Sequence, residues 1–190
     1  MENLKKVALV TGAAKGIGRT IALEMGRAGY NMVVNYRSDK AAAMTLCEEI
    51  KAFGQDSIAL YADMGVLSDI QTMYKDALAY YDRIDVLVNN AGISSEVYFL
   101  DANEKDFDRM TAIDWKGLFF SSQYAAKAMV ERDIHGVIIN ISSNQVEGCW
   151  PRATIYAPTK AAVSKFTRNA AMELSLKKID EKKIRSIKFK

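Results

Sequence analysis

K6-V-A-L-V-T-G-A-A-K-G-I-G18 sets the architecture that we expect for the whole chain. Lys6–Val10 is an apolar run typical of a buried strand, and Thr11–Gly18 is a turn rich in glycine. Ile17–Ala28 then has the spacing of an amphipathic helix, with Gly29 as its stop. A glycine turn between a strand and a helix offers free N–H groups and the positive end of the helix dipole to a phosphate. The stretch therefore predicts nucleotide binding, with a purely structural turn as the alternative.

Each glycine of this turn has its own predicted role. Gly12 allows a tight turn, Gly16 lets the backbone approach a pyrophosphate, and Gly18 lets the helix pack against the strand. The candidate cofactor-binding residues of the turn are Gly12, Ala14, Lys15, Gly16, Ile17 and Gly18.

The end of the second expected strand, Asn31–Asn35, indicates which dinucleotide is bound. A carboxylate at this place would bind a ribose 2′-hydroxyl and repel a 2′-phosphate. The sequence instead has Tyr36, Arg37 and Ser38 here. Lys15 of the glycine turn can converge on the same place, and two cations without an acid favour NADP over NAD. The alternative is that Arg37 is an ordinary surface arginine.

Strands and helices alternate along the rest of the chain. We expect the strands and helices Lys40–Phe53, Ser57–Tyr61, a helix to about Tyr80, Val86–Val88, helices from Asn103 to about Glu131, Gly136–Ile141 and Ala153–Leu176. This alternation predicts a three-layer, doubly wound α/β fold of the Rossmann type, with a parallel sheet in the strand order 3-2-1-4-5. No repeat or linker interrupts the pattern, so we expect residues 1–190 to form a single dinucleotide-binding and catalytic domain.

A second stretch, S143-N-Q-V-E-G-C-W-P-R-A-T-I-Y-A-P-T-K160, carries groups suited to proton transfer. Tyr156 and Lys160 are four residues apart, so on a helix the phenol and the ammonium share a face. Ser143 follows the fifth expected strand, at the edge where open α/β sheets place their chemistry. Pro158 fits only in the first turn of that helix. Taken alone, a Tyr–Lys pair at this spacing also occurs in helices by chance.

Composition and charge exclude several other classes. Hydrophobic residues make up 49% and charged residues 26%, which is typical of a globular rather than a disordered chain. Cys47, Cys149 and the single His135 lie in unrelated contexts, so we expect neither a metal site nor a disulfide, which fits a reducing cytoplasm. No apolar run reaches membrane-spanning length, and the N-terminus runs into a strand rather than a cleavable signal.

The C-terminal range Lys177–Lys190 holds seven basic and two acidic residues in a chain of net charge +3. We expect a solvated basic tail and no nucleic-acid partner, with a contact to nucleic acid or an anionic surface as the alternative.

Four motifs, in their order and spacing, resemble those of the short-chain dehydrogenases/reductases. They are T11-G-A-A-K-G-I-G18, N89-N-A-G92, the Ser143 of N-I-S-S, and Y156-A-P-T-K160. The resemblance covers residues 5 to about 176 and is nearest to the 3-oxoacyl-carrier-protein reductase and sugar or polyol dehydrogenase branch. It implies an NADP-dependent oxidoreductase that interconverts a small-molecule carbonyl and a secondary alcohol by hydride transfer.

The resemblance also implies roles for individual residues. Tyr156 would be the acid/base and Ser143 would hold the substrate oxygen. Lys160 would bind the nicotinamide ribose and, with the oxidised nicotinamide, lower the pKa of the Tyr156 phenol from its usual value of about 10. Asp63 would accept a hydrogen bond from the adenine amino group, or would merely terminate the third strand. The other implied cofactor-binding residues are Met64, Asn90, Ala91 and Gly92.

Asp114 departs from the family pattern. The family usually has an asparagine in the motif that here reads I113-D-W-K-G117, and its main chain helps hold a water leading to Lys160. A main-chain role survives the substitution, but a carboxylate has no N–H donor and carries a charge. We therefore keep Asp114 in the candidate catalytic set with an altered role, in which it pairs with Lys160 and weakens the effect of that ammonium on Tyr156.

The C-terminal part is the second departure. The family continues past the Tyr–Lys helix through a sixth strand, a proline-glycine turn, a helix pair and a seventh strand, whereas this sequence ends at Lys190. We expect the sixth and seventh strands to be largely missing, with only Ile184–Ile187 resembling the start of the sixth, and the fifth strand to lie at an open edge. The alternative function is a truncated, catalytically inactive relative that at most binds the nucleotide. We also expect a homodimer at most, built through the helices of Asp114–Glu131 and Ala153–Leu176.

Overall fold

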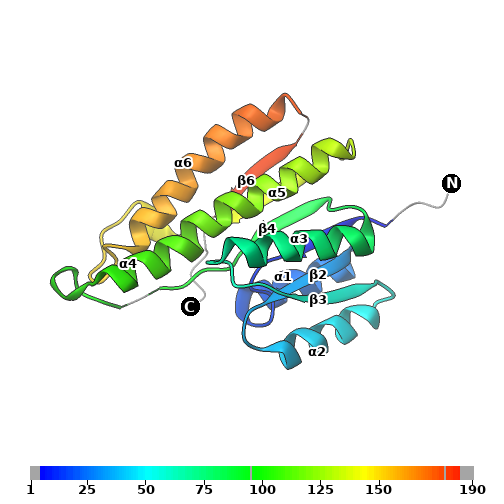
Figure 1. The fold of residues 1–190 in the computed structure, drawn as a ribbon, viewed down its shortest axis with the longest axis horizontal. Coiled ribbons are helices and arrows are strands. Elements are labelled where there is room, and N and C mark those ends of the chain that lie inside the picture. The colour runs from blue at the N-terminus through cyan, green and yellow to red at the C-terminus, as the bar shows by residue number, and fades with distance from the viewer. Residues whose placement is uncertain (1–4, 95, 178, 185–190) are drawn as a thin grey trace.

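The computed structural model describes residues 5–94, 96–177 and 179–184. Six strands form one sheet in the order β3-β2-β1-β4-β5-β6, and each neighbouring pair is parallel (Figure 1). The strands are β1 (Val7–Val10), β2 (Asn31–Tyr36), β3 (Ser57–Tyr61), β4 (Val86–Asn89), β5 (Val137–Ile141) and β6 (Asp180–Ile184). The Rossmann-like α/β class and the strand order 3-2-1-4-5 are thus confirmed.

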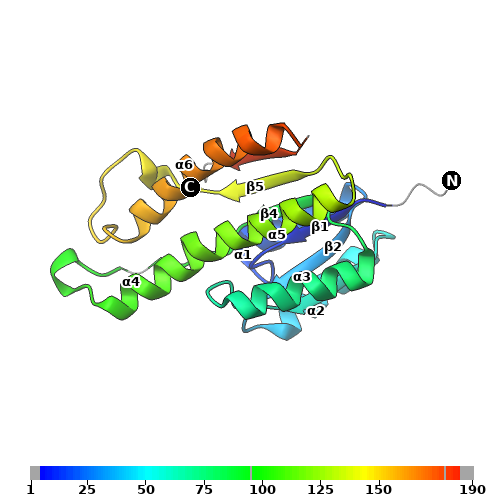
Figure 2. The same ribbon diagram turned by 45° about the horizontal axis from the view of Figure 1, so that its top comes forward.

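Helices connect the strands as the alternation predicts. The α-helices are α1 (Gly16–Arg27), α2 (Lys40–Lys51), α3 (Leu67–Tyr81), α4 (Glu104–Thr111), α5 (Leu118–Glu131) and α6 (Tyr156–Ser175). Two short 3-10 turns, η1 (Phe99–Asp101) and η3 (Asn144–Val146), lie in the loops after β4 and β5, and a π-helical segment, η2 (Ala112–Gly117), joins α4 to α5. Figure 2 shows α4 running into α5 as one long helical element.

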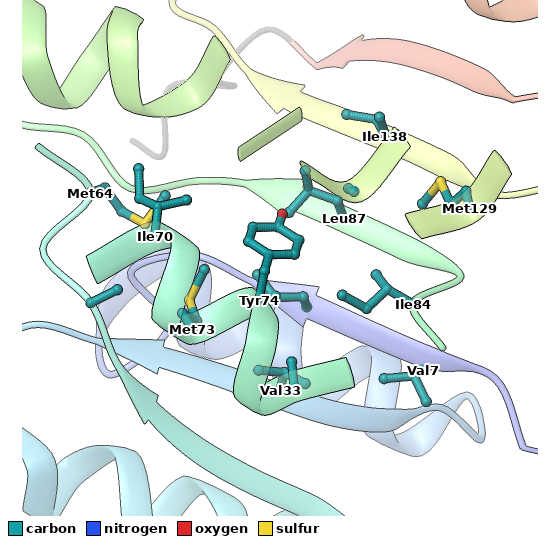
Figure 3. Packing of buried hydrophobic residues seen from close by; sticks show 14 of the residues in the cluster. Val7, Val33, Met64, Ile70, Met73, Tyr74, Ile84, Leu87, Met129 and Ile138 are labelled. Carbon is teal, nitrogen blue, oxygen red and sulfur yellow. The ribbon is translucent and has the colours of Figure 1, made fainter. Parts of the chain in front are cut away.

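Alternating side chains of the strands divide the core into two layers. Val7 and Leu9 of β1 face one side of the sheet, where Met73 and Tyr74 of α3 and Met129 of α5 pack against them (Figure 3). The other side holds Ala8 and Val10 with buried residues of α1 and α2, among them Ala22, Leu46 and Ile50. Nearly continuous apolar strands are what a sheet covered on both faces requires.

Local signals mark the ends of two helices and the starts of two others, as the sequence indicates. Gly29 and Gly54, which follow α1 and α2, have positive φ of 97° and 80°. The Asn103 side chain accepts a hydrogen bond from Asp106 N at 3.0 Å and so caps α4. Pro158 is the third residue of α6, inside the first turn, where its missing N–H costs no helical hydrogen bond.

The expectation for the sixth strand is wrong, since Asp180–Ile184 forms β6 beside β5, in register from Val137↔Asp180 to Ile141↔Ile184. The fifth strand is therefore not an open edge. Ile179, just before the strand, is buried, and Asp180 N donates to Gly136 O at 3.0 Å, so this side chain and backbone pairing help anchor the strand. An apolar run is not needed for that pairing, which is why the sequence pattern missed it.

The range expected as a basic tail is likewise only partly a tail. Lys182 and Lys183 belong to β6. Lys178 and residues 185–190, which include most of the predicted Ile184–Ile187 strand, lie outside the described residues. The described part of the chain contains no seventh strand.

Candidate functional site

The glycine turn after β1 requires glycine at two positions by backbone conformation and at a third by close contact. Gly12 and Gly16 have positive φ of 63° and 57°, a conformation that favours glycine. A Cβ on Gly18 would lie 2.4 Å from Asn90 Nδ2 and 2.6 Å from Gly12 O. Gly18 is therefore required by the turn and by Asn90 of the loop after β4, rather than by the strand.

Two residues that the sequence did not single out hold this turn in place. The Asn35 side chain, 1% exposed at the end of β2, accepts a hydrogen bond from Gly12 N at 2.9 Å and donates to Ala62 O at 3.2 Å. The Thr11 hydroxyl accepts hydrogen bonds from Asn90 N and Ala91 N, both at 3.0 Å. The bracing role of Asn35 depends on tertiary contacts that spacing does not reveal.

The residues around the turn fit a dinucleotide. No side chain caps the N-terminus of α1, and no acidic residue lies in its first turn, so its free N–H groups remain available to an anion. A Cβ on Gly16 would meet nothing within 4 Å, which leaves room for a ligand against the backbone. Ile17, at 44% exposed, lies at the same helix end.

Lys15 and Arg37 are exposed, as a contact with a ribose 2′-phosphate would require. Tyr36 packs edge-on against Tyr61, with ring centroids 6.1 Å apart. The nearest following carboxylate, Asp39, accepts a hydrogen bond from Ala42 N at 2.8 Å as the N-cap of α2. Ser38 is exposed beside it.

Asp63, after β3, has a partner that the sequence did not reveal. Its carboxylate accepts hydrogen bonds from Gly65 N at 2.8 Å and from Arg109 of α4 at 3.0 Å. Burial acts to raise the pKa of Asp63, but these two donors outweigh it and hold that pKa below its usual range. The side chain of Met64, predicted to bind the cofactor, is buried in the core.

The predicted proton-transfer groups meet at the carboxyl ends of β4 and β5. Tyr156 and Lys160 occupy the first turns of α6, and Lys160 Nζ lies 5.6 Å from the centre of the Tyr156 ring. Lys160 is buried and donates a hydrogen bond to Ile141 O at 3.2 Å. Ser143 is also buried, and its hydroxyl accepts a hydrogen bond from Gln145 N at 3.1 Å.

Asp114 reaches the same place from the π-helical segment. Its side chain is fully buried, and Oδ1 accepts a hydrogen bond from Ile93 N at 2.8 Å. Oδ2 lies 4.0 Å from Lys160 Nζ and makes no hydrogen bond. The expected pairing of Asp114 with Lys160 is therefore present. A Cβ on Gly92 would lie 3.3 Å from Lys160 Nζ, so the N-A-G loop closes over the pair.

Comparison with known proteins identifies the family. Residues 6–185 match the family described as short chain dehydrogenase. The chain belongs to this family. A 3-oxoacyl-[acyl-carrier-protein] reductase FabG from Staphylococcus aureus is 40% identical over 172 residues, covering 90% of this chain and 70% of the relative. A short-chain dehydrogenase/reductase from Pestalotiopsis microspora is 38% identical over 175 residues, covering 92% of this chain and 65% of the relative. The chain thus spans about two thirds of the length of these curated relatives.

Solved structures of this family have the same fold. An acetoin dehydrogenase from Enterobacter cloacae superposes with a TM-score of 0.90 at 35% identity, covering 94% of this chain and 71% of that chain. A metagenomic short-chain oxidoreductase in complex with NADP superposes with a TM-score of 0.91 at 29% identity, covering 97% of this chain and 84% of that chain.

In this short-chain dehydrogenase, burial and paired charges set the protonation of the three central groups. Burial raises the pKa of Asp114 to about 6, against the lowering effects of Lys160 and of the Ile93 N–H. Burial lowers the pKa of Lys160, and Asp114 opposes that change. Burial raises the pKa of Tyr156, a hydrogen bond with Ser143 lowers it, and Asp114 raises it again. The chain's own groups therefore raise the Tyr156 pKa instead of lowering it.

The loops beside the site carry exposed side chains. Arg152, with a positive φ of 61°, pairs with Glu96 at 3.0 Å and lies 4.9 Å from the centre of the Tyr98 ring. Trp150 is 37% exposed. These contacts join the loop after β4 to the loop before α6, which leads into Tyr156.

Within residues 5–94, 96–177 and 179–184, no three His, Cys, Asp or Glu side chains gather as a metal site would require. No helix in that part of the chain has the length and apolar character needed to cross a membrane.

Proposed function

We propose that this short-chain dehydrogenase is an NADP-dependent oxidoreductase that interconverts a carbonyl and a secondary alcohol. The observation that carries the proposal is the gathering of Tyr156, Lys160 and Ser143 at the carboxyl edge of the sheet, beside a glycine turn that fits a dinucleotide. The bound cofactor supplies the hydride chemistry. The chain supplies position and a proton.

Each residue of the set has one task. In carbonyl reduction the Tyr156 phenol gives its proton to the carbonyl oxygen, and in alcohol oxidation the phenolate takes it back. The Ser143 hydroxyl donates a hydrogen bond to the same oxygen, and the Lys160 ammonium, fixed by Ile141 O, keeps N–H groups for the nicotinamide ribose. Burial of Lys160 strengthens its interactions because water is excluded around it.

Replacing Tyr156 tests this assignment. Tyr156→Phe removes the proton donor and keeps the ring, so we expect reduction of carbonyls with NADPH to fall about 10²- to 10⁴-fold. The panel includes 3-oxoacyl thioesters and acetoin, which the names of the relatives suggest. Tyr80→Phe, at an exposed tyrosine of α3, is the matched control. Equal rates for Tyr156→Phe and the control would remove Tyr156 from the mechanism.

We infer the preference for NADP from Lys15 and Arg37, which are exposed near the predicted ribose, and from Asp39, which is occupied as a helix cap. Arg37→Ala and Lys15→Ala each remove a charge that would face the 2′-phosphate. We expect the Kd for NADP to rise about tenfold and the Kd for NAD to change much less. Lys75→Ala on α3 controls for net charge. Parallel changes for NADP and NAD would contradict the assignment.

A second candidate function is nucleotide binding without turnover. The ion pair between Asp114 and Lys160 favours it, because a paired Lys160 attracts the ribose and polarises Tyr156 less than a free one. Calorimetric titration with NADPH, run beside the turnover assay on residues 1–190, separates the two functions. Binding without turnover of any panel substrate supports this candidate, and measurable turnover rules it out.

We also propose a homodimer and a cytoplasmic location. A groove of about 580 Å³ between η2–α5 and α6, lined by Trp115, Phe119 and Phe166 among others, offers an apolar surface to a second copy. Phe166→Asp should shift sedimentation to the monomer, and an unchanged value would contradict this interface.

Free thiols at Cys47 and Cys149 are consistent with a reducing compartment, which cell fractionation would test.

A further inference from the structure

A buried carboxylate beside the catalytic lysine is the feature that the proposed mechanism leaves unused. Asp114 is 0% exposed, and one of its oxygens accepts a hydrogen bond from Ile93 N. The other oxygen accepts none and lies 4.0 Å from Lys160 Nζ, whose side chain is only 5% exposed. Unscreened by water, this pair interacts more strongly than a surface pair of the same length.

The surrounding backbone fixes the pair. Gly92 lies against both groups, since a Cβ there would be 3.3 Å from Lys160 Nζ and 3.5 Å from Asp114 Oδ1. Ile93 N donates to one Asp114 oxygen, and Ile141 O accepts a hydrogen bond from Lys160 Nζ. The carboxylate therefore cannot turn away from the lysine without losing a hydrogen bond in a buried place.

Few charges act on Tyr156. Among the described residues, the π-helical segment contributes Asp114, and α6 contributes Lys160 at 5.6 Å from the Tyr156 ring centre. The loop after β5 contributes the Ser143 hydroxyl. A cation that favours the phenolate is thus accompanied by an anion that disfavours it.

We propose that Asp114 is a positioning residue which, by pairing with Lys160, keeps Tyr156 protonated and extends carbonyl reduction to a higher pH than an unpaired Lys160 would allow. The inference rests on the proposed function. During reduction the hydride of a reduced nicotinamide dinucleotide forms the new C–H bond. The electron pair of the C=O π bond takes the Tyr156 proton, and the phenolate left behind regains a proton from solvent. Reduction therefore stops when Tyr156 loses its proton before the hydride moves.

The test is Asp114→Asn, which keeps the shape and the acceptor for Ile93 N–H but removes the charge. In the profiles of rate against pH, carbonyl reduction falls and alcohol oxidation rises as Tyr156 loses its proton. Both of these limbs should move down by about one pH unit. Asp108→Asn, an exposed change on the neighbouring α4, should leave both limbs in place. A second neutral variant, Asp114→Ser, should shift them in the same direction.

A titration that needs no turnover separates this inference from the proposed function. The ultraviolet absorbance of tyrosinate is followed against pH in the wild type and Asp114→Asn, each with its own Tyr156→Phe background subtracted. The Tyr156 transition should move down by about one pH unit in Asp114→Asn. An unmoved or upward transition would overturn the inference even if the enzyme turns over. A shifted transition in a protein without turnover would support it and count against the proposed function.

Discussion

The candidate site has a nucleotide side, around the glycine turn, and a proton-transfer side, around Lys160. Different interactions hold the two sides in place. Around the glycine turn, Gly12 N, Asn90 N and Ala91 N each donate to a side chain, and Gly18 lies against other atoms of the turn. Around Lys160, one buried oxygen of Asp114 makes no hydrogen bond and lies 4.0 Å from Lys160 Nζ. The first side is specified by shape, since Gly18 leaves no room for a Cβ. The second is specified by charge, so a change of charge at constant shape should matter most there.

Gly18→Ala should have the largest effect. The new Cβ would lie 2.4 Å from Asn90 Nδ2 and 2.6 Å from a backbone oxygen, so the turn must distort. We expect a loss of about 3 kcal/mol or more in the free energy of unfolding, measured by urea denaturation, with loss of NADPH binding. Gly16→Ala, where no atom lies within 4 Å, should lose only about 1 kcal/mol through its positive φ. Equal losses at the two positions would show that packing does not govern the turn.

On the proton-transfer side, Asp114 should make the free energy of unfolding depend on pH. The folded pKa of Asp114 is raised from 3.8 to about 6, so its unfolded form ionises first. The stability it contributes is full below pH 3.8 and is lost as the pH rises through about 6, by roughly 3 kcal/mol. The Asp114→Asn variant should lack this dependence of stability on pH. Denaturation of both proteins between pH 4 and pH 7 measures the difference, and parallel curves would refute the raised pKa.

Asn35→Ala should weaken the shape-specified side to an intermediate degree. It removes the acceptor of Gly12 N and leaves that N–H without its partner, so we expect a loss of about 2 kcal/mol in unfolding free energy and roughly tenfold weaker NADPH binding. Asn31→Ala is the control, because Asn31 makes a similar bond to Asp56 N at the other end of β2. It should lower stability without changing nucleotide affinity. Weaker binding in both variants would mean that Asn35 acts only through global stability.

Arg152→Ala should have the smallest effect on stability. The ion pair with Glu96 is largely exposed, and such pairs contribute less than about 1 kcal/mol. We expect an unchanged urea midpoint but a raised KM, since the two loops beside Tyr156 lose their link. A changed midpoint together with an unchanged KM would assign Arg152 to folding alone.

Sequence predicted the parts of the site that depend on local pattern. The glycine turn and the Tyr156–Lys160 spacing lie within single segments, so their geometry follows from helix and turn rules. Asn35 was missed as a brace because its partners, Gly12 and Ala62, come from other segments. For the same reason the partnership of Asp63 with Arg109 was not foreseen.

Two elements of the fold could not be predicted from the sequence. β6 follows the buried Ile179 and pairs with β5 through its main chain, a contact that no apolar period in the sequence indicates. In the π-helical segment Ala112–Gly117, Gly117 packs against a carbonyl, and a Cβ there would lie 1.8 Å from Met64 O. Hydrogen-bond registers of this kind depend on tertiary contact and not on propensity.

That π-helical segment also changes the phase of the long helical element. One extra residue inserted into an α-helix rotates everything beyond it by about 100°. α4 and α5 therefore present faces that are not continuous with each other, and Asp114 points inward at the break. Arg109 can therefore pair with Asp63 while α5 keeps its own face on the sheet. Deleting a single residue between 112 and 117 would restore a regular α-helix. In that helix α4 and α5 could not both keep their present contacts.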